Sequence, residues 1–404
     1  MTNKLVPKLR FPEFSGEWDL SKVGDLCISI VPGRNKPTLF NGDIPWITIA
    51  DIKTTKISTS INMLFVSEKE ACEISSKILP VGTVIMSCVG QFGIVGISIN
   101  RVIINQQLHS FICSELLNNY FLMYSLVTQV NFMDQVSTKT SVPYMNKENC
   151  NSIPIYYPQM EEQTKIADFL TSVDDKIQQL TKKKVLLEQY KKGIMQQIFS
   201  QQLRFKDDSG KDYPAWQERT LGDIAIQLVN GVSLEQNDYS NGYKVTRIET
   251  ISDTYININR VGFIDTSVNI EGYKLKIGDM LFSNINSVKH IGKIAYVDKD
   301  YNLYHGMNLL KIRINDKNNS KYMYYVLTSI KYKSHFEKIC NQAVNQASIN
   351  QSELKKTTMH LPYLEEQTKI ADFLTSIDDK ITQVTAMLKQ IQQYKKSLLQ
   401  QMFI

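Results

Sequence analysis

A long segment of the chain occurs twice, and this repeat constrains the fold more than any other feature. Residues 161–200 read EEQTKIADFLTSVDDKIQQLTKKKVLLEQYKKGIMQQIFS, and they return 204 positions later as residues 365–404, EEQTKIADFLTSIDDKITQVTAMLKQIQQYKKSLLQQMFI. Fifteen of the first sixteen residues are identical between the two copies. A similarity of this extent indicates a tandem duplication, so the chain is expected to contain two related halves.

Apolar residues in both copies follow alternating steps of three and four, which is the spacing of a coiled-coil seam. The first seam consists of Ile166, Leu170, Val173, Ile177, Leu180, Leu187, Ile194 and Ile198, with Lys184 and Lys191 filling its two gaps. The second consists of Ile370, Leu374, Ile377, Ile381, Val384, Leu388, Ile391, Leu398 and Met402, with Lys395 as its polar member. Neither copy contains an internal proline, so each can form one helix of about 40 residues, roughly 60 Å long.

A helix of this length cannot bury its apolar stripe alone, and the other copy is the obvious partner. An antiparallel pairing relates the two halves by an approximate two-fold axis. The expected fold is therefore α+β, with two β-rich globular domains joined by two long helices that form an antiparallel coiled coil. The expected boundaries are 1–159 and 203–363 for the globular domains, and 160–202 and 364–404 for the helices. The alternative is two ordinary amphipathic helices in separate domains.

Composition restricts the class of protein only broadly. With 21% charged and 43% hydrophobic residues, the chain has the make-up of a globular protein, and its net charge of +6 permits a nucleic-acid partner without requiring one. The N-terminal MTNKLVPKLRF lacks the apolar core of a signal peptide. No CxxC pair occurs among the six cysteines, which predicts neither a disulfide framework nor a structural zinc and favours a cytoplasmic protein.

Residues 78–100 carry no charge and could be mistaken for a membrane span. The corresponding residues 276–298 contain Asp279, Lys289, His290 and Lys293, so the shared structure must be compatible with water. We therefore expect a β-hairpin in both halves and no membrane association. The glycine-rich residues 90–96 are then a hairpin turn rather than a cofactor loop.

The duplication extends beyond the helices. The tripeptide LRF opens both halves at residues 9–11 and 203–205, and a tryptophan follows in each, Trp18 and Trp216. Strands are expected at 81–87 and 277–283, and short helices at 117–130 and 321–330. The globular parts share this scaffold but few identities, whereas the connectors are nearly identical. Two modules of this kind are expected to perform the same type of task on two different targets.

The arrangement resembles the specificity subunit of type I restriction-modification systems. The resemblance is carried by residues 158–170, PQMEEQTKIADFL, and residues 362–374, PYLEEQTKIADFL, each of which closes a variable domain and begins a long helix. It implies that each globular domain is a target recognition domain that reads one half of a split double-stranded DNA site. It also implies that the helices set the gap between the half-sites and dock two methyltransferase subunits, through which the restriction (motor-nuclease) subunits join.

The candidate DNA-binding residues are basic and amide side chains in turn-rich segments, because Lys and Arg contact phosphates while Arg, Lys, Asn and Gln read base edges. In the first domain they are Arg34, Asn35, Lys36, Lys53, Lys56, Gln91, Gln106, Gln107, Lys139, Thr140, Ser141 and Tyr144. In the second they are Lys244, Thr246, Arg247, Asn284, Asn286, Lys289, His290, Asn345, Gln346, Ser348 and Asn350. For any one of these residues, a solvated loop is the alternative interpretation.

No catalytic pattern is found. The chain contains no HExxH metal motif, no GxxxxGK[ST] phosphate loop, and no Asn/Asp-Pro-Pro-aromatic tetrapeptide of the amino-methyltransferases. We therefore expect a subunit that is not catalytic by itself, with no catalytic residue, metal or cofactor of its own. The competing hypothesis is a coiled-coil scaffold whose two domains bind protein or carbohydrate ligands.

Overall fold

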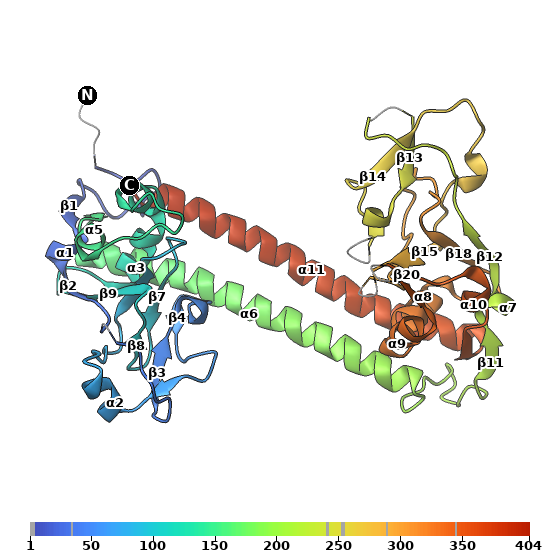
Figure 1. The fold of residues 1–404 in the computed structure, drawn as a ribbon, viewed down its shortest axis with the longest axis horizontal. Helices are drawn as coiled ribbons and strands as arrows, with labels where there is room; N and C mark the ends of the chain where they lie inside the picture. Colours follow the sequence, from blue (N-terminus) through green and yellow to red (C-terminus); the bar gives the residue numbers. More distant parts are fainter. Residues whose placement is uncertain (1–4, 34, 240–241, 252–254, 288–289, 344–345) are drawn as a thin grey trace. The chain divides into compact units, whose positions relative to one another are not determined.

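The computed structural model describes residues 5–404 except residue 34 and the ranges 240–241, 252–254, 288–289 and 344–345. The chain forms two compact units, Met1–Lys183 with Val384–Ile404, and Lys184–Gln383. The two long helices, α6 (Met160–Phe199) and α11 (Leu364–Met402), each contribute one part to each unit. Figure 1 shows both helices as continuous ribbons, with α6 in green and α11 in red.

The helix pair is antiparallel within each unit. In the first unit the start of α6 packs against the end of α11, where Leu170 and Val173 share a core with Leu398. In the second unit the end of α6 packs against the start of α11, where Ile198 shares a core with Ile370. The predicted α+β fold with antiparallel long helices is confirmed, and the alternative of two helices in separate domains is excluded.

The described residues of the first unit form three sheets and five short helices before α6. Its helices are α1 (Val23–Leu26), α2 (Glu68–Glu73), α3 (Asn119–Thr128), α4 (Val130–Val136) and α5 (Lys147–Asn151), with a 3-10 turn η1 (Ile49–Asp51). Its strands are β1 (Asp19–Lys22), β2 (Cys27–Ile30), β3 (Ile44–Ile47), β4 (Lys56–Ile57), β5 (Phe65–Val66), β6 (Val84–Ser87), β7 (Val95–Ser98), β8 (Ile103–Ile104), β9 (Leu108–Cys113) and β10 (Pro154–Tyr157). The sheets are ordered β2-β9-β6-β7-β4, β5-β3-β8 and β1-β10.

The second unit repeats this plan with different loops. Its short helices are α7 (Leu221–Ile224), α8 (Ser320–Thr328), α9 (Ile330–Ile339) and α10 (Gln351–Lys355), with 3-10 turns η2 (Ile248–Ile251) and η3 (Glu271–Tyr273). Its strands are β11 (Gln217–Thr220), β12 (Ala225–Asn230), β13 (Tyr243–Thr246), β14 (Val261–Ile264), β15 (Met280–Phe282), β16 (Ile285–Asn286), β17 (Ile294–Tyr296), β18 (Leu310–Ile314), β19 (Asn341–Ala343), β20 (Gln346–Ser348) and β21 (Thr358–Leu361). The sheets are β12-β18-β15-β17, β13-β14, β16-β20-β19 and β11-β21.

The predicted hairpins belong to the main sheet of each unit, inside the sheet in the first unit and at its edge in the second. Strand β6 pairs antiparallel with β7, and β15 pairs antiparallel with β17. A glycine precedes the second strand in each case, Gly93 with φ +78° and Gly292 with φ +73°, in the left-handed region that favours glycine. A Cβ on Gly93 would lie 2.5 Å from Val130 Cγ2, so the turn also needs the missing side chain. No helix in the described part of the chain is long and apolar enough to cross a membrane.

The short helices α3 and α8 lie where the ranges 117–130 and 321–330 predicted them. A second helix that was not predicted follows each of them, α4 after α3 and α9 after α8. The first pair breaks at Gln129 and the second at Ser329, which has an extended backbone with ψ 158°. The break redirects the chain, so that α9 can place the buried Phe336 in the core.

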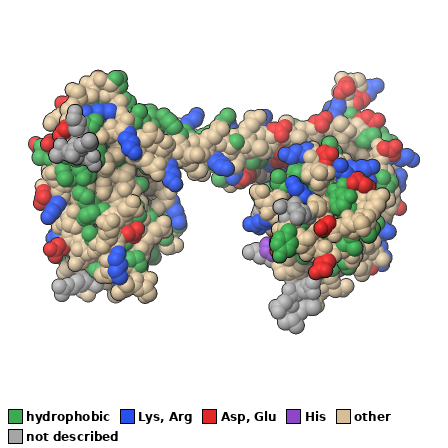
Figure 2. Space-filling model, turned by 90° about the horizontal axis from the view of Figure 1, so that it is seen from above, with side chains coloured by type: hydrophobic (Ala, Val, Ile, Leu, Met, Phe, Trp, Pro, Cys, Tyr) green, Lys and Arg blue, Asp and Glu red, His purple; other side chains and the backbone are tan. Residues whose placement is uncertain are grey.

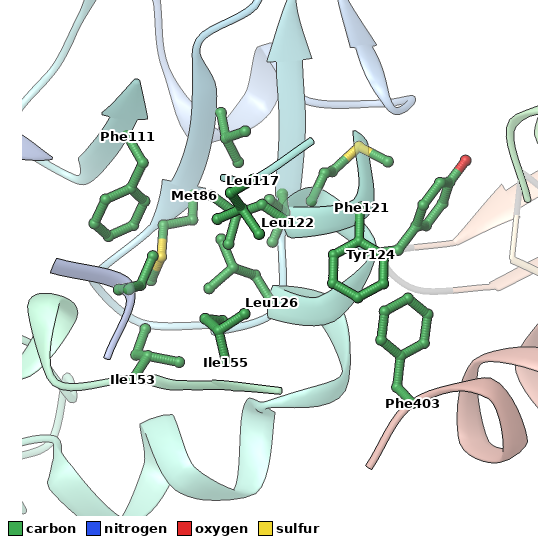
Figure 3. Close-up of a cluster of buried hydrophobic side chains, with 14 of the residues drawn as sticks. Met86, Phe111, Leu117, Phe121, Leu122, Tyr124, Leu126, Ile153, Ile155 and Phe403 are labelled. Atoms are coloured by element: carbon green, nitrogen blue, oxygen red, sulfur yellow. The ribbon is translucent and has the colours of Figure 1, made fainter. Parts of the chain in front are cut away.

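An aromatic cluster joins the end of each long helix to the globular domain. Phe403, just after α11, stacks on Phe121 of α3 with ring centroids 5.2 Å apart, as Figure 3 shows. The equivalent Phe199 at the end of α6 contacts Tyr322 of α8 at 6.0 Å. Both contacts are buried among aliphatic residues, so each helix end is part of a domain core.

Candidate nucleic-acid interface

The identical residues that begin the long helices hold the domains in place. Glu162 accepts two hydrogen bonds from the Arg10 guanidinium, both 2.7 Å long, and Glu366 accepts two from Arg204 at 3.2 and 2.6 Å. Both carboxylates are buried, and a bidentate pair fixes direction as well as distance. The repeated LRF tripeptides therefore supply a structural arginine to each half.

The neighbouring glutamine has an equally structural role. The Gln163 side-chain oxygen accepts from the Asn118 backbone N–H at 2.9 Å, and its amide nitrogen donates to the Pro158 carbonyl at 2.8 Å. Gln367 makes the same contacts with Asn319 and Pro362, both at 2.9 Å. The last two residues of the repeated EEQ motif are therefore engaged inside each domain, and the candidate DNA contacts lie in the loops that differ.

In the first unit, two of the predicted segments lie side by side. The turn after β6 meets the loop before α5, where the Gly90 N–H donates to the Pro143 carbonyl at 2.8 Å and Val89 forms a β-bridge with Tyr144. The loop closes on itself, because the Thr138 N–H donates to the Tyr144 carbonyl at 2.9 Å. We call residues 88–91 and 137–144 the first loop pair.

Two further predicted segments join the first loop pair. The Cys88 N–H donates to the Gln107 carbonyl at 2.9 Å, which places the turn at 105–107 beside residues 88–91. The Gln106 side chain donates to the Gly33 carbonyl at 2.9 Å and ties in the loop that carries Asn35. Segments that are more than 100 residues apart in the sequence thus converge on one surface.

Most of the first-domain candidates are available to a ligand. The exposed residues are Asn35, Lys36, Lys53, Gln91, Gln107, Lys139, Thr140, Ser141 and Tyr144, while Gln106 is half-buried. Lys56 is already engaged, because its ammonium lies 2.8 Å from Asp175 of α6. Lys53 and Lys56 line a cavity of about 540 Å³ beside that helix. No residue of the first loop pair lines this cavity. Arg34 lies outside the described residues.

The second unit has an equivalent arrangement. Strand β16 pairs with β20, with Ile285 opposite Ser348, and β19 pairs with β20 to form a hairpin. The Ile349 N–H donates to the Asn284 carbonyl at 2.8 Å. We call residues 284–287 and 341–350, apart from the undescribed 344–345, the second loop pair. It corresponds to the first loop pair, because it joins the segment after β15 to the segment before α10.

The second-domain candidates are less uniform. Lys244 and Asn350 are exposed, and Asn286, His290 and Ser348 are half-buried. Asn350 caps α10 by accepting from the Glu353 N–H at 2.7 Å, so its side-chain oxygen is already engaged. Gln346 contributes its backbone to β20. Lys289 and Asn345 lie outside the described residues.

Three second-domain candidates are held inside the domain. Thr246 is buried, and its hydroxyl accepts from the Gly306 N–H at 2.8 Å. Asn284 is 7% exposed, and its side-chain oxygen has no hydrogen-bond partner among the residues that the structure describes. Arg247 donates to the Gln236 side chain, to Asp238 and to the Asn237 carbonyl at 2.6–3.1 Å. As placed, these side chains support the loops rather than project from them.

Asn105 was not among the predicted residues, although it positions one of them. It donates from its amide to the Gln107 side-chain oxygen at 3.2 Å and accepts from the Gln107 N–H at 3.2 Å. Its place in an Asn-Gln-Gln turn is the sequence signal that could have identified it. These two hydrogen bonds fix the orientation of the exposed Gln107 side chain.

Charge is distributed over both units. Figure 2 shows Lys and Arg side chains on this face of both units, with Asp and Glu among them on both. Among the described residues, no group of three or more His, Cys, Asp and Glu side chains could hold a metal ion. The two loop pairs therefore present hydrogen-bonding groups, and cations are scattered around them. This combination suits a ligand that carries both phosphates and hydrogen-bonding base edges.

A protein-family model matches both halves of the chain. The family is described as the type I restriction modification DNA specificity domain, and it matches residues 15–189 and 214–393. The two matched segments coincide with the two repeats.

Several curated proteins are similar in sequence. The putative type I restriction enzyme MjaX specificity subunit of Methanocaldococcus jannaschii is 40% identical over 214 residues, which cover 52% of this chain and 50% of that protein. The matched part thus spans about half the length of that relative. The MjaIX specificity subunit of the same organism is 25% identical over 333 residues, 71% of this chain and 75% of that protein.

Solved structures share the fold over nearly the whole chain. The S subunit of a type I restriction-modification system from M. genitalium superposes with a TM-score of 0.64 at 14% identity, covering 99% of both chains. A chain from a structure of complex assembly and conformational transition of the type I R-M system gives a TM-score of 0.55 at 17% identity, covering 96% of this chain and 97% of that one.

Proposed function

Because the chain belongs to the family of type I restriction-modification DNA specificity domains, we propose that it is the sequence-specific DNA-binding subunit of such a complex. Each globular domain reads one half of a bipartite, asymmetric site in double-stranded DNA. The helix pair sets the gap between the half-sites. The chain thereby directs adenine methylation and restriction that are carried out by its partners in the cytoplasm.

The observation that supports this proposal most is that the contacts between long helix and domain are the same in the two units, whereas the loop pairs differ in their side chains. Glu162 and Glu366 make the same contacts in the two units, whereas the loop pairs occupy equivalent positions with different side chains. Tyr144 of the first loop pair corresponds to Ser348 of the second, since each faces the turn after the central strand. Equal supports with unequal contact residues suit two reading heads for two different base sequences.

The loop pairs and other exposed candidate residues have the side-chain chemistry for base and phosphate contacts. Gln91 and Gln107 present amides that can donate and accept at once, as bidentate recognition of adenine requires. Lys139 and Lys244 are exposed cations that can contact phosphates. Asn286 and Ser348 supply the corresponding hydrogen-bonding groups in the second domain.

The outer faces of the helices support docking of two copies of one partner. Glu161, Asp168, Ser172 and Lys176 are exposed and recur as the exposed Glu365, Asp372, Ser376 and Lys380. The domains need Glu162 and Gln163 for their own packing, but these outer residues make no comparable contact with the described part of the domains. We assign the repeated face to two methyltransferase subunits, and the restriction subunits join through these. The chain itself contributes no catalytic group and no cofactor.

The test is binding to a library of duplexes that varies both half-sites and the gap, with purified chain and methyltransferase partner. We expect one asymmetric bipartite motif with a fixed gap, and the same motif among methylated adenines in the host genome. The affinity should fall steeply with salt, since phosphate contacts release counterions. A salt-insensitive complex with a protein or a carbohydrate, and no selected duplex, would refute the proposal.

A further inference from the structure

The two seam lysines that recur in the repeat both form ion pairs across the helix pair. Lys191 of α6 lies 2.6 Å from Asp378 of α11, and Lys395 of α11 lies 2.6 Å from Asp174 of α6. The pairs are partly shielded, with side-chain exposures of 22% and 32% in the first and 21% and 13% in the second. Each pair lies within one unit, so each aligns the helices where a domain is attached.

Each ion pair also contacts the globular domain. The hydroxyl of Tyr325 in α8 donates to the second oxygen of Asp378 at 2.7 Å, and Tyr124 in α3 does the same to Asp174 at 2.7 Å. The lysine ammonium lies over the ring of that tyrosine, 5.0 Å from the centroid for Lys191 and 5.3 Å for Lys395. One aspartate therefore joins both long helices and the domain.

The cluster recurs although the short helices around it differ. α3 reads NYFLMYSLVT and α8 reads SKYMYYVLT, yet a tyrosine occupies the equivalent position in both. The lysine and aspartate are 204 residues apart from their counterparts, like the rest of the repeat. The same contact geometry thus arises twice from separately diverged surroundings.

An apolar seam alone does not define one alignment, because a shift by seven residues again places apolar residues opposite one another. The two residue numbers of each ion pair total 569, which means that both pairs belong to the same antiparallel register. A shift by one heptad would place Lys191 opposite Ala371 or Thr385, and Lys395 opposite Ala167 or Thr181. Neither lysine would then meet a carboxylate, so both ion pairs would be lost together.

We infer that the clusters Lys191–Asp378–Tyr325 and Lys395–Asp174–Tyr124 are positioning residues that lock the register of the helix pair and tie each domain to that register. The consequence for the gap between half-sites depends on the proposed function, whereas the register itself does not. The third seam lysine, Lys184, provides a contrast, because its recorded ion pair is with Glu188 of its own helix at 3.8 Å.

The register can be measured in the full chain by disulfide trapping. Gln178 and Gln392 line the same cavity as Asp174 and Lys395, so Gln178→Cys with Gln392→Cys reports the observed alignment. Gln178→Cys with Thr385→Cys reports a shift by one heptad. Mass spectrometry of the linked peptides separates these disulfides from any formed by the native thiols.

We expect the observed disulfide to form at least tenfold faster than the shifted one in the parent chain. Combining Lys191→Met with Lys395→Met should reduce this preference at least threefold, because no alignment then gains an ion pair across the helices. The thermal midpoint should fall, because Asp174 and Asp378 keep their charge and lose the lysine. Lys191→Arg with Lys395→Arg should retain the preference, and so should the matched control Lys184→Met. Asp174→Asn with Asp378→Asn provides a second test that preserves side-chain size. An unchanged preference in both the methionine and the asparagine variants would overturn the lock.

The same variants then test the gap. With the methionine pair, the duplex library should yield half-sites of unchanged sequence but a broader distribution of gaps. A register that loosens while the gap stays fixed would show that the clusters do not set the spacing. Failure of every variant and of the parent to select a duplex would refute the proposed function and leave the disulfide result to decide on the lock.

Discussion

Two buried histidines give the chain a pH dependence that belongs to single residues. His109 on β9 is 2% exposed and contacts the Ser29 hydroxyl at 2.8 Å, and burial, with Lys147 adding to it, lowers its pKa to about 4. His305 is fully buried, and burial lowers its pKa to about 4 as well. Both imidazoles are therefore neutral in the folded chain at pH 5.

Stability is expected to fall as the pH drops from about 6.5 toward 4. In that pH range, a histidine in the unfolded chain, with the ordinary pKa of 6.5, is protonated, whereas the buried histidine in the folded chain stays neutral. Proton binding therefore stabilises the unfolded state. Between pH 7.5 and pH 5 each histidine should cost about 2 kcal/mol. Urea unfolding at both pH values measures this loss, and His109→Gln or His305→Gln should reduce it. His360→Asn, at an exposed position, is the control; an equal reduction there would contradict the assignment.

The polar residues illustrate what sequence reasoning can resolve at this scale. Lys56, Arg247 and Asn350 have the side chains expected of DNA-binding residues, but the structure uses them for an ion pair, a loop support and a helix cap. A side chain of one chemical type serves either purpose, and its partner often lies far along the chain, as Asp175 does for Lys56. Residue type and turn signals could therefore select the segments but not the available side chains.

At the scale of elements, periodicity predicted what is local. The two long helices lie over the repeated segments 161–200 and 365–404, because their seams are unbroken by proline. The hairpins β6-β7 and β15-β17 could also be predicted from the sequence, since glycines and short apolar runs mark them. The following helices α4 and α9 were not predicted, and no strong helix breaker marks the boundaries at Gln129 and Ser329.

The loop pairs could not be predicted as pairs. Their contacts join residues that are distant in sequence, such as Val89 with Tyr144 and Ile285 with Ser348. Such pairings depend on the completed sheet and not on local preference. The buried Thr246 shows the same effect, because the chain around Gly306 that covers it is 60 residues away.

The two loop pairs should be independent in their effect on DNA recognition. Tyr144→Ala is expected to lower affinity for the preferred duplex about tenfold and to relax base preference in one half-site only, since a lost base contact is worth 1–3 kcal/mol. Ser348→Ala should relax the other half-site. Both side chains reach the surface, so thermal midpoints should be unchanged. Competition binding against single-base variants measures the effect, with the exposed helix residue Tyr190→Ala as control. Relaxation spread over both half-sites would count against separate reading heads.

At the scale of the whole molecule, the repeat separates what must be equal from what must differ. Arg10 with Glu162 and Arg204 with Glu366 show the equal part, a buried connection between domain and helix. The loop pairs show the unequal part. Exposed residues such as Asp168 and Asp372 are identical in the two copies although domain packing does not require it. A partner that binds in two copies would explain this identity.

Two repeated outer faces imply two partner subunits bound per chain. Asp168→Lys with Lys176→Glu changes the exposed face of the first copy, and Asp372→Lys with Lys380→Glu changes that of the second. Each pair should reduce the methyltransferase subunits bound per chain from two to one, because opposite charges would face an unchanged partner. All four changes together should abolish binding. Analytical ultracentrifugation of the complexes gives the count.

The matched control uses exposed charges that the repeat does not share. Lys182 and Lys183 stand on the first helix, whereas Ala386 and Met387 occupy the equivalent positions in the second. Lys182→Glu with Lys183→Glu should therefore leave two methyltransferase subunits bound. Loss of a subunit in this control, or retention of both after all four changes, would show that the repeated face is not where the partners dock, and the identity of the two helices would need another explanation.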